Sequence, residues 1–448
     1  MITIKTTEYQ LISRNKESFL EIHFNCESKE GMCSSNVTIN VTYLSALLAK
    51  SSETVRGLFY FASLVYAIDR TFKREIHSVD GWSRLFDVEF KLPADAIFSI
   101  NRNEIEKILS FLTGDYWKCS FEASDNITYQ EKEIPSDYNE ISQVNLFSGG
   151  LDSLIGAIDF MSKNNKGKVF LASHYDSSMP GPKADQTGLL NVLHGEYSQK
   201  YITFPHRHSA ILITPKDGRD TTCRSRSLLF ISLALVVAEY THTNIIIPEN
   251  GSVSLNYPLS ASRRGSCSTR TTHPVVIHGI NRMLKHMDLS SQIYNPYEFM
   301  TKGEMVRGCY NRDLLLNIVK KSNSCGKRGR KQLFYDDNTA THCGRCMPCM
   351  YRKASLTGFN DDTRYGIKLD TLFNLKNRTI SDDFYAMLNF LRKNLSEAEI
   401  REELSIAGMS NMPQFDLYVD LVKRTRNELK EMLKSANNNS INEYLGLC

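Results

Sequence analysis

The sequence predicts an α/β protein built on a parallel sheet with helices on both faces, preceded by an α+β unit and followed by a helical extension. Short apolar segments alternate with helical segments between residues 143 and 247, which is the order of a parallel sheet. The 448 residues are 41% hydrophobic and 23% charged, an ordinary globular composition that can bury a sizeable core. Beyond about residue 357 the pattern becomes helical.

Residues 1–125 predict an N-terminal α+β domain. Alternating polarity indicates its strands, and apolar residues at helical spacing indicate its helices. No motif of known chemistry falls inside this domain; the resemblance described below implies that it is a candidate surface for a partner protein. Polar residues 126–142 predict a linker after it. The expected strands are 19–24, 37–43 and 87–91, and the expected helices are 56–71 and 103–112.

Residues 143–357 predict the central domain, and residues 358–448 predict a C-terminal helical extension. In the extension, Ser396 and Glu399 have the spacing of a capping box. The tail at 437–440 is expected to fray. The expected strands of the central domain are 143–147, 169–173, 210–214 and 244–247, its expected helices are 152–163, 184–200 and 224–240, and a last helix is expected at 415–434.

The strongest functional motif lies between the first expected strand and the first expected helix of the central domain. It reads Ser148-Gly149-Gly150-Leu151-Asp152-Ser153. Two glycines let the backbone turn tightly, and the N–H groups of the turn and the helix N-terminus form a nest for phosphate oxygens. The serine hydroxyls add donors, and Asp152 is suited to hold a Mg²⁺ ion bridging the phosphates. A plain turn with a serine N-cap is the alternative.

Four cysteines predict a zinc site. Cys343, Cys346 and Cys349 follow one another with two residues between, and Cys325 precedes them by seventeen intervening residues. This spacing is typical of a closed tetrahedral site, and four thiolates leave no open position, so a structural Zn²⁺ is expected. His342 is adjacent to Cys343 and is expected to be an outer neighbour of the ion or exposed.

A basic segment covers the same region. Residues 319–353 hold nine Lys and Arg against two Asp, a net charge of +7, whereas the whole chain has a net charge of +4. Four thiolates around zinc carry a net charge of −2, which basic side chains would offset; RNA binding is the alternative explanation. The residues expected to offset the thiolates are Arg328, Lys331, Arg345, Arg352 and Lys353.

Three cations are expected at helix starts, where the helix dipole disfavours positive charge. Arg224 and Arg226 open an apolar helix, and Lys302 follows Thr301, which forms a capping-box pattern with Glu304. A bound anion would reverse the unfavourable interaction, and exposure to solvent is the alternative. In a chain that also has a phosphate-loop motif, three such cations form a pattern that favours a bound anion over exposure to solvent.

The hexapeptide resembles the PP-loop of the ATP pyrophosphatases, which bind ATP and cleave it to AMP and pyrophosphate. With the helix starts and the cysteines, the chain resembles the QueC family of 7-cyano-7-deazaguanine synthases within that class. The segment 226–230, RSLLF, is similar to the family's Arg-Asn-hydrophobic helix start, and 301–305, TKGEM, is similar to its Lys-x-Glu-hydrophobic segment. The resemblance covers about residues 143–357, roughly half of the chain.

The resemblance implies a division of roles. Residues 148–153 would bind ATP with Mg²⁺, Arg226 and Lys302 would stabilise the leaving pyrophosphate, and the four cysteines would hold Zn²⁺ under the substrate lid. The family adenylates 7-carboxy-7-deazaguanine and lets ammonia attack, first to the amide and then to the nitrile. Replacing the catalytic Asp152 by alanine is expected to abolish pyrophosphate release while leaving the fold intact.

The chain departs from the family pattern on the substrate side. The family's Tyr-Gly-Gln after the second strand is replaced by His174-Tyr175-Asp176, its Arg-Asn pair is replaced by Arg226-Ser227, and its substrate loop is only echoed by segments 250–251, 257–258 and 263–274. These changes bear on the nucleophile rather than on ATP. The candidate substrate residues are Glu249, Asn250, Tyr257 and His273.

The enlarged form resembles the QueC-like proteins of bacterial anti-phage operons, in particular QatC of the Qat system. That resemblance implies an ATP-dependent carbon-nitrogen ligase that joins a deazaguanine carboxylate to an amine of a partner protein in antiviral defence. The alternatives are ordinary nitrile synthesis with ammonia, tRNA modification with sulfur carried by Cys223, Cys267 or Cys309, and a non-catalytic nucleotide-binding subunit. Nucleic acid is the less expected partner.

No segment is expected to cross a membrane. The longest apolar run, residues 228–238, is interrupted by Ser232 and is shorter than the roughly 20 residues that a span needs. The first ten residues lack the pattern of a secretory signal. We therefore expect a cytoplasmic protein with reduced thiols, in which clustered cysteines bind metal.

Overall fold

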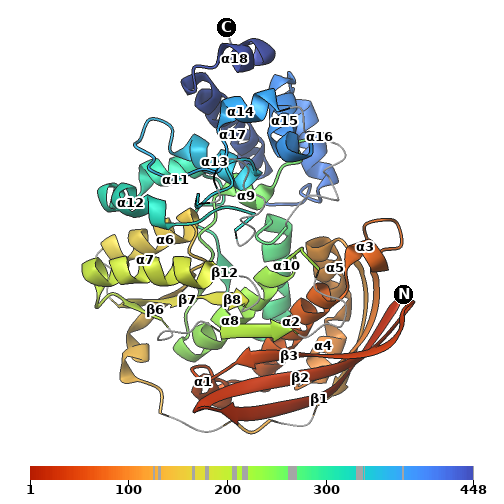
Figure 1. Ribbon diagram of the computed structural model, residues 1–448. Coiled ribbons are helices and arrows are strands. Elements are labelled where there is room, and N and C mark those ends of the chain that lie inside the picture. Colours follow the sequence, from red (N-terminus) through yellow and green to blue (C-terminus); the bar gives the residue numbers. More distant parts are fainter. Residues whose placement is uncertain are drawn as a thin grey trace.

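Two sheets form the framework of the protein (Figure 1). A seven-stranded mixed sheet has the order β5-β4-β1-β2-β3-β10-β8, and a five-stranded parallel sheet has the order β12-β11-β6-β7-β9. The α/β class predicted from the sequence is thus confirmed. The computed structural model describes residues 1–124, 127–129, 133–163, 167–176, 181–203, 209–213, 220–260, 270–328, 337, 339–375 and 378–446.

The first half of the mixed sheet comes from the N-terminal region. β1, β2 and β3 form an antiparallel meander, and β4 and β5 continue it in parallel to β1. Alternate residues of β4 are buried, because one face of the sheet packs on helices. The strands are β1 (Ile2–Arg14), β2 (Glu17–Ser28), β3 (Gly31–Asn40), β4 (Leu85–Leu92) and β5 (Tyr116–Ala123), and the helices are α1 (Ser45–Lys50), α2 (Glu53–Thr71), α3 (Arg74–His77), α4 (Asp95–Ile100) and α5 (Arg102–Thr113).

Two short strands from the central region complete the mixed sheet. β10 (Ser209–Ile213) pairs antiparallel with β3 and parallel with β8 (His174–Asp176). A strand at 210–214 was expected in the parallel sheet, and this expectation is wrong. The apolar edge of β3 offers unpaired backbone groups, and β10 satisfies them, with Ile211 opposite Ile39. The N-terminal and central regions therefore share one sheet.

The parallel sheet has β6 at its centre. β6 pairs with β7 on one side and β11 on the other, and α6 follows β6 directly. The strands are β6 (Ile141–Leu146), β7 (Lys168–Ala172), β9 (Tyr201–Ile202), β11 (Ile245–Ile246) and β12 (Ile293–Tyr294). The helices of this region are α6 (Leu151–Ser162), α7 (Pro182–Tyr197), α8 (Arg226–Thr241), α9 (Gly251–Leu255) and α10 (Pro274–His286), and a 3-10 helix, η1 (Ser136–Glu140), precedes β6.

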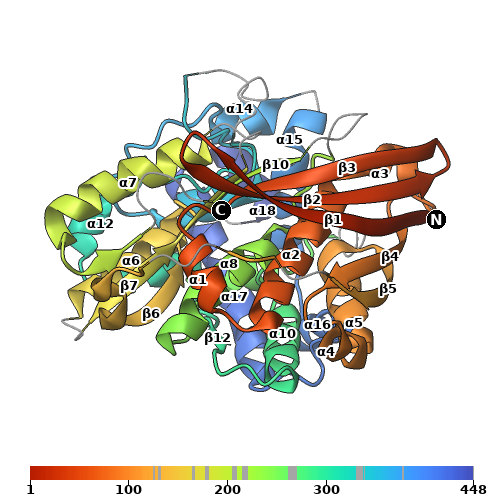
Figure 2. The same cartoon turned by 90° about the horizontal axis from the view of Figure 1, so that it is seen from below.

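Helix α8 joins the two sheets into one core. Its residues 228, 229 and 231–238 are buried, because it packs against α2 on one side and against β6 and β11 on the other (Figures 1 and 2). Burial on all sides explains why this segment is the longest apolar run of the chain.

The remainder of the described chain is helical and packs above the edge of the parallel sheet (Figure 1). The predicted capping boxes of Thr301 with Glu304 and of Ser396 with Glu399 are confirmed. The tail does not fray as expected, because Asn438 caps a further helix, α18, that packs on α15. The elements are α11 (Lys302–Gly308), α12 (Arg312–Ile318), η3 (Val319–Lys321), α13 (Met347–Ser355), α14 (Leu369–Asn374), α15 (Arg378–Arg392), α16 (Glu397–Ile406), α17 (Phe415–Ser435) and α18 (Asn439–Leu445).

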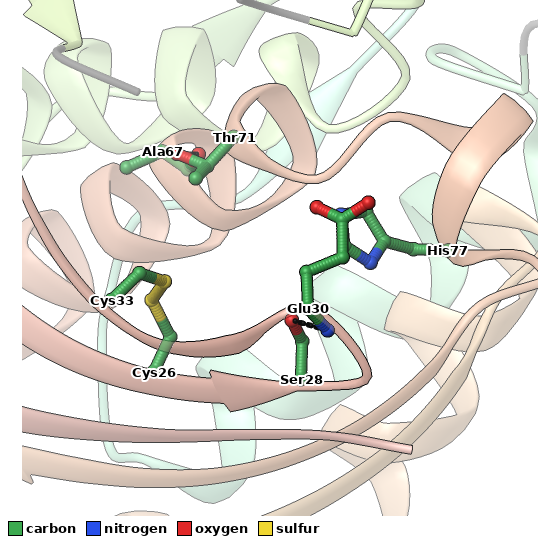
Figure 3. The surroundings of a disulfide bond; sticks show 7 residues. All are labelled: Cys26, Ser28, Glu30, Cys33, Ala67, Thr71 and His77. Atoms are coloured by element: carbon green, nitrogen blue, oxygen red, sulfur yellow. Dashed lines mark hydrogen bonds and ion pairs between the residues drawn. A yellow bond between two sulfur atoms is a disulfide. The ribbon is translucent and has the colours of Figure 1, made fainter. Parts of the chain in front are cut away.

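Cys26 and Cys33 form a disulfide across β2 and β3 (Figure 3). The register places them directly opposite each other, with their Cα atoms 5.1 Å apart. This pair departs from the expectation of reduced thiols, since the hairpin register brings the two sulfurs within bonding reach.

Among the described residues, no helix is both long and apolar enough to cross a membrane.

Candidate functional site

The hexapeptide forms the turn between β6 and α6, as predicted. Gly149 has a φ of +85°, a conformation that favours glycine, and Gly150 is the N-cap of α6. Ser148 Oγ accepts a hydrogen bond from Gly150 N (3.3 Å), and Ser153 Oγ donates to Gly150 O (3.0 Å). The turn directly follows β6, the central strand, and therefore lies at the carboxyl edge of the parallel sheet. Ligands bind at this edge in such sheets.

Three residues that sequence reasoning missed hold the turn in place. Gln186 of α7 lies against Gly149, where a Cβ would approach Gln186 Cγ to 3.2 Å. Asn323 N donates to Gly149 O (2.9 Å), and Ser324 Oγ accepts from Leu151 N (3.3 Å). The only signal in the sequence was the position of Asn323 and Ser324 immediately before the first cysteine of the predicted metal site.

Asp152 and Lys302 form a buried ion pair beside the turn. Lys302 Nζ lies 2.7 Å from both carboxylate oxygens of Asp152, and the two side chains are 4% and 8% exposed. Asn250 Nδ2 donates to Asp152 Oδ2 (2.8 Å). Burial raises the pKa of Asp152, but the charge of Lys302 and these hydrogen bonds outweigh it and hold the pKa below its usual range.

Glu249 is the second carboxyl group of the site. Burial raises its pKa well above the usual value, and the negative charge of Asp152 raises it further. Its backbone is fixed by Asn295, whose Nδ2 donates to Glu249 O (2.8 Å). The site therefore pairs an ionised carboxylate, Asp152, with a carboxyl group that retains its proton to higher pH.

Arg226 lies close to the turn, whereas Arg224 does not. Arg226 donates to Nδ1 and to the carbonyl oxygen of His174, both at 3.4 Å, and Gln186 Nε2 donates to that carbonyl (3.0 Å) and to Ser148 O (3.3 Å). Arg224 turns into the N-terminal region instead, where it donates to Thr113 O (3.1 Å) and stacks on the Trp82 ring at 4.6 Å.

The N-terminal region fixes the start of α8, which carries Arg226. Asp69 Oδ2 accepts hydrogen bonds from Ser225 N (3.1 Å) and Ser225 Oγ (2.7 Å). Arg84, fully buried, holds Asp69 through a 2.6 Å ion pair. Asp220 Oδ2 accepts from Arg74 N (2.9 Å). The N-terminal region therefore positions the segment that leads into α8.

Two buried polar atoms, one beside the turn and one at the start of α8, have no hydrogen-bond partner among the described residues. They are Gln186 Oε1 and Ser227 Oγ, both buried. Buried polar atoms are nearly always paired, so such atoms favour a ligand or water at this place. Gln186 and Arg226, the neighbour of Ser227, both donate to the carbonyl oxygen of His174. The residues at this edge of the sheet thus suit a polar, anionic ligand such as a nucleotide.

The four cysteines come together as predicted. The sulfurs of Cys325, Cys343, Cys346 and Cys349 lie within 4.8 Å of one another, and all four residues are buried. Backbone N–H groups of Lys327 (3.4 Å) and Cys343 (3.3 Å) point to Cys325 Sγ. His342 is not a fifth ligand: its Nε2 accepts from Ser324 N (3.3 Å), and burial lowers its pKa to about 2. This donor set suits Zn²⁺.

The basic residues of this region are largely committed to internal contacts. Arg352 is fully buried and donates to Ser322, Val319 and Thr363, all neutral acceptors. Burial lowers the pKa of Lys353, and the nearby cysteine sulfurs oppose that shift. Arg345 is buried, and Arg328 pairs with Asp185 (2.6 Å). These internal contacts argue against an RNA-binding face made by these side chains. Lys353 lies where it can offset the thiolates, whereas Arg328 was expected to do so but pairs with Asp185; Lys331 lies outside the described residues.

The other candidate substrate residues, Tyr257 and His273, contact α15 and residues near the start of α10. Tyr257 packs on Phe390 of α15 with ring centroids 5.6 Å apart. His273 caps α10, with Nδ1 accepting from Val275 N (3.3 Å), and its ring packs on Phe111 at 5.0 Å. Among the single cysteines, Cys309 is buried, Cys223 adjoins Arg70 and Tyr66, and Cys267 lies outside the described residues.

Because of the buried side chain of His273, we expect the stability of the folded chain to depend on pH. Burial, assisted by Arg270, lowers its pKa to about 3, whereas an unfolded histidine titrates near 6.5. Between these values only the unfolded chain binds the proton, so stability is lost as the pH falls, by about 1.4 kcal/mol per pH unit at most. Replacing His273 by Asn keeps an N-cap and should flatten this slope. Denaturant unfolding at pH 6.5 and 5.0 measures it, and equal slopes in both proteins would contradict the assignment.

Comparison of the chain with protein-family models, with curated proteins and with solved structures found no match.

Proposed function

We propose that this protein is an ATP-dependent ligase of the PP-loop type that adenylates the carboxylate of a 7-deazaguanine and couples it to an amine. The observation that carries the proposal is the Ser-Gly-Gly-Leu-Asp-Ser turn at the carboxyl end of β6, with the Asp152–Lys302 pair beside it. Anti-phage defence with a partner protein as the amine donor is the context that the resemblance suggests.

The chemistry divides between two displacements. A substrate carboxylate oxygen attacks the α-phosphorus of ATP, the α–β anhydride bond breaks, and pyrophosphate leaves. An amine nitrogen then attacks the acyl carbon, and AMP leaves with the bonding electrons. Preorganised positive charge would stabilise the pyrophosphate in the first step. Lys302, which pairs with Asp152, and Arg226, which donates to His174, are the cations that would supply this charge.

The site suits magnesium and zinc in different ways. Asp152 is the carboxylate of the turn that would hold Mg²⁺, which neutralises triphosphate charge when bound. The four cysteines would hold Zn²⁺ in a closed, structural site. Glu249 has a raised pKa and is suited to give or take a proton during amine attack.

Pyrophosphate release tests the proposal. The full chain is incubated with ATP, Mg²⁺ and 7-carboxy-7-deazaguanine, with ammonia or a protein encoded beside it as the acceptor. A pyrophosphate burst with a mass increase on the protein acceptor is the expected result. Turnover with ammonia alone would identify a nitrile synthase instead, and no turnover with any carboxylate would overturn the ligase assignment and direct the search to tRNA or to a non-catalytic role.

A further inference from the structure

Helix α17 of the C-terminal extension places a carboxylate, Glu428, at the start of α11, the helix that begins at Lys302. Glu428 accepts hydrogen bonds from Thr301 Oγ1 (2.6 Å) and from Gly303 N (3.0 and 3.1 Å). Its side chain is only 12% exposed. The two residues that flank Lys302 in the chain are therefore both bound to one carboxylate of the C-terminal extension.

Gly303 makes this close approach possible. A Cβ at position 303 would overlap Glu428 Oε2 and lie 2.7 Å from Glu428 Cδ. The helical conformation of this residue does not require glycine, so the absence of a side chain serves the contact with Glu428.

The same face of α17 also supports Asn250, which donates a hydrogen bond to Asp152 from outside the turn. A Cβ at Gly251, which follows Asn250, would lie 2.7 Å from Leu421 Cδ2 of α17. The next residue, Ser252, shares a 2.5 Å hydroxyl–hydroxyl hydrogen bond with Thr425 of α17. Leu421, Thr425 and Glu428 are spaced by four and three residues and so lie on one helix face.

We propose that α17 holds Asn250 and Lys302 against Asp152, and that Glu428 is a positioning residue that acts through Lys302. As a catalytic statement this inference rests on the proposed function, because it assumes that Lys302 stabilises the leaving pyrophosphate. The C-terminal extension then completes the ATP site from a distance, with no contact to substrate by Glu428 itself.

The kinetic test compares Glu428→Ala with the conservative Glu428→Gln. Glu428→Ala should lower kcat for pyrophosphate formation about tenfold and leave the KM for ATP within about twofold, because the lost interaction acts in the transition state. Glu428→Gln keeps one acceptor oxygen and should retain most of the rate. Glu431→Ala, on an exposed turn of the same helix, is the matched control and should match the unaltered chain.

A second readout does not depend on activity. Acetylation of lysines by an amine-reactive ester, followed by peptide mass analysis, should find Lys302 protected in the unaltered chain. In Glu428→Ala, Lys302 should react at least about tenfold faster, since local opening controls access to a buried group. Lys353, which is partly buried beside the cysteine cluster, should keep its rate and so report that the rest of the fold is intact.

The outcomes separate the two proposals. An unaltered chain that releases no pyrophosphate overturns the proposed function, and the acetylation of Lys302 still decides the positioning role. Release of pyrophosphate together with unchanged kcat and unchanged Lys302 protection in Glu428→Ala overturns the positioning role alone. If Glu428→Ala does not fold, Gly303→Ala, which crowds the same carboxylate, takes its place with the same expected results.

Discussion

Replacing Asp152 by alanine is expected to destabilise the fold by about 3 kcal/mol or more, in addition to ending pyrophosphate formation. The structure changes the expectation from sequence that this substitution leaves the fold intact. Lys302 Nζ contacts both oxygens of Asp152, and the lysine side chain is 4% exposed. Without Asp152, a buried ammonium group would lose its counter-charge, which is among the costliest changes in a folded protein.

The double variant Asp152→Ala/Lys302→Met separates stability from activity. In the double variant the Lys302 ammonium group, which has no counter-charge in Asp152→Ala, is also absent. The free energy of unfolding should therefore be at least about 1 kcal/mol higher than in Asp152→Ala alone. It should remain inactive, because both groups belong to the proposed ATP site. Denaturant unfolding gives the free energies of unfolding, and pyrophosphate release gives the activity.

An exposed ion pair supplies the control for this experiment. Lys5 pairs with Glu89 at the surface, with the lysine side chain 55% exposed. Lys5→Met should leave the free energy of unfolding nearly unchanged, since exposed pairs contribute little. An Asp152→Ala variant as stable as Lys5→Met would contradict the buried pair.

Local patterns predicted the elements that depend on local sequence. The apolar periodicity of 56–71 and 415–434 predicted α2 and α17, and the cysteine spacing predicted the cluster of four sulfurs. The strand-turn-helix position of the hexapeptide was also predicted correctly, since Gly149 has the left-handed conformation that the turn requires. Each of these features is determined within a few tens of residues.

Contacts between distant segments were not predicted, because no local period encodes them. β10 pairs with β3 about 170 residues earlier, so its sheet could not be assigned from its own apolar residues. Nothing in the sequence distinguishes Gln186 and Ser324 from other polar residues, and only the folded chain shows that they contact the turn. Glu428 is likewise one of many helical acidic residues, and only the neighbouring Gly303 marks its contact.

Loss of the metal is expected to have the second large effect. The purified chain should contain about one zinc ion, and Cys343→Ser should lose it. Metal binding contributes about 10 kcal/mol or more to folding in small structural zinc domains, so a loss of several kcal/mol is expected here. The cluster ties the segment at Cys325 to the loop before α13 and to the first turn of α13, and without zinc the four buried thiols would offer only weak interactions.

Loss of zinc should also weaken nucleotide binding, although none of the cysteines lies in the turn at residues 148–153. Asn323 N donates to Gly149 O and Ser324 Oγ accepts from Leu151 N, and both residues directly precede Cys325. Releasing Cys325 would free this segment from the phosphate loop. Cys309→Ala, which removes a buried thiol outside the cluster, should keep both the zinc and the nucleotide affinity.

Metal analysis and ATP titration of Cys343→Ser and Cys309→Ala distinguish a coupled site from two independent ones. If the metal only stabilises its own cluster, Cys343→Ser would lose zinc and stability but would bind ATP as the unaltered chain does. If the segment at 323–325 transmits the effect, ATP affinity should fall about tenfold or more, because opening this segment removes two hydrogen bonds to the turn. A chain that is fully stable and binds ATP without zinc would contradict both the structural role of the metal and its coupling to the loop.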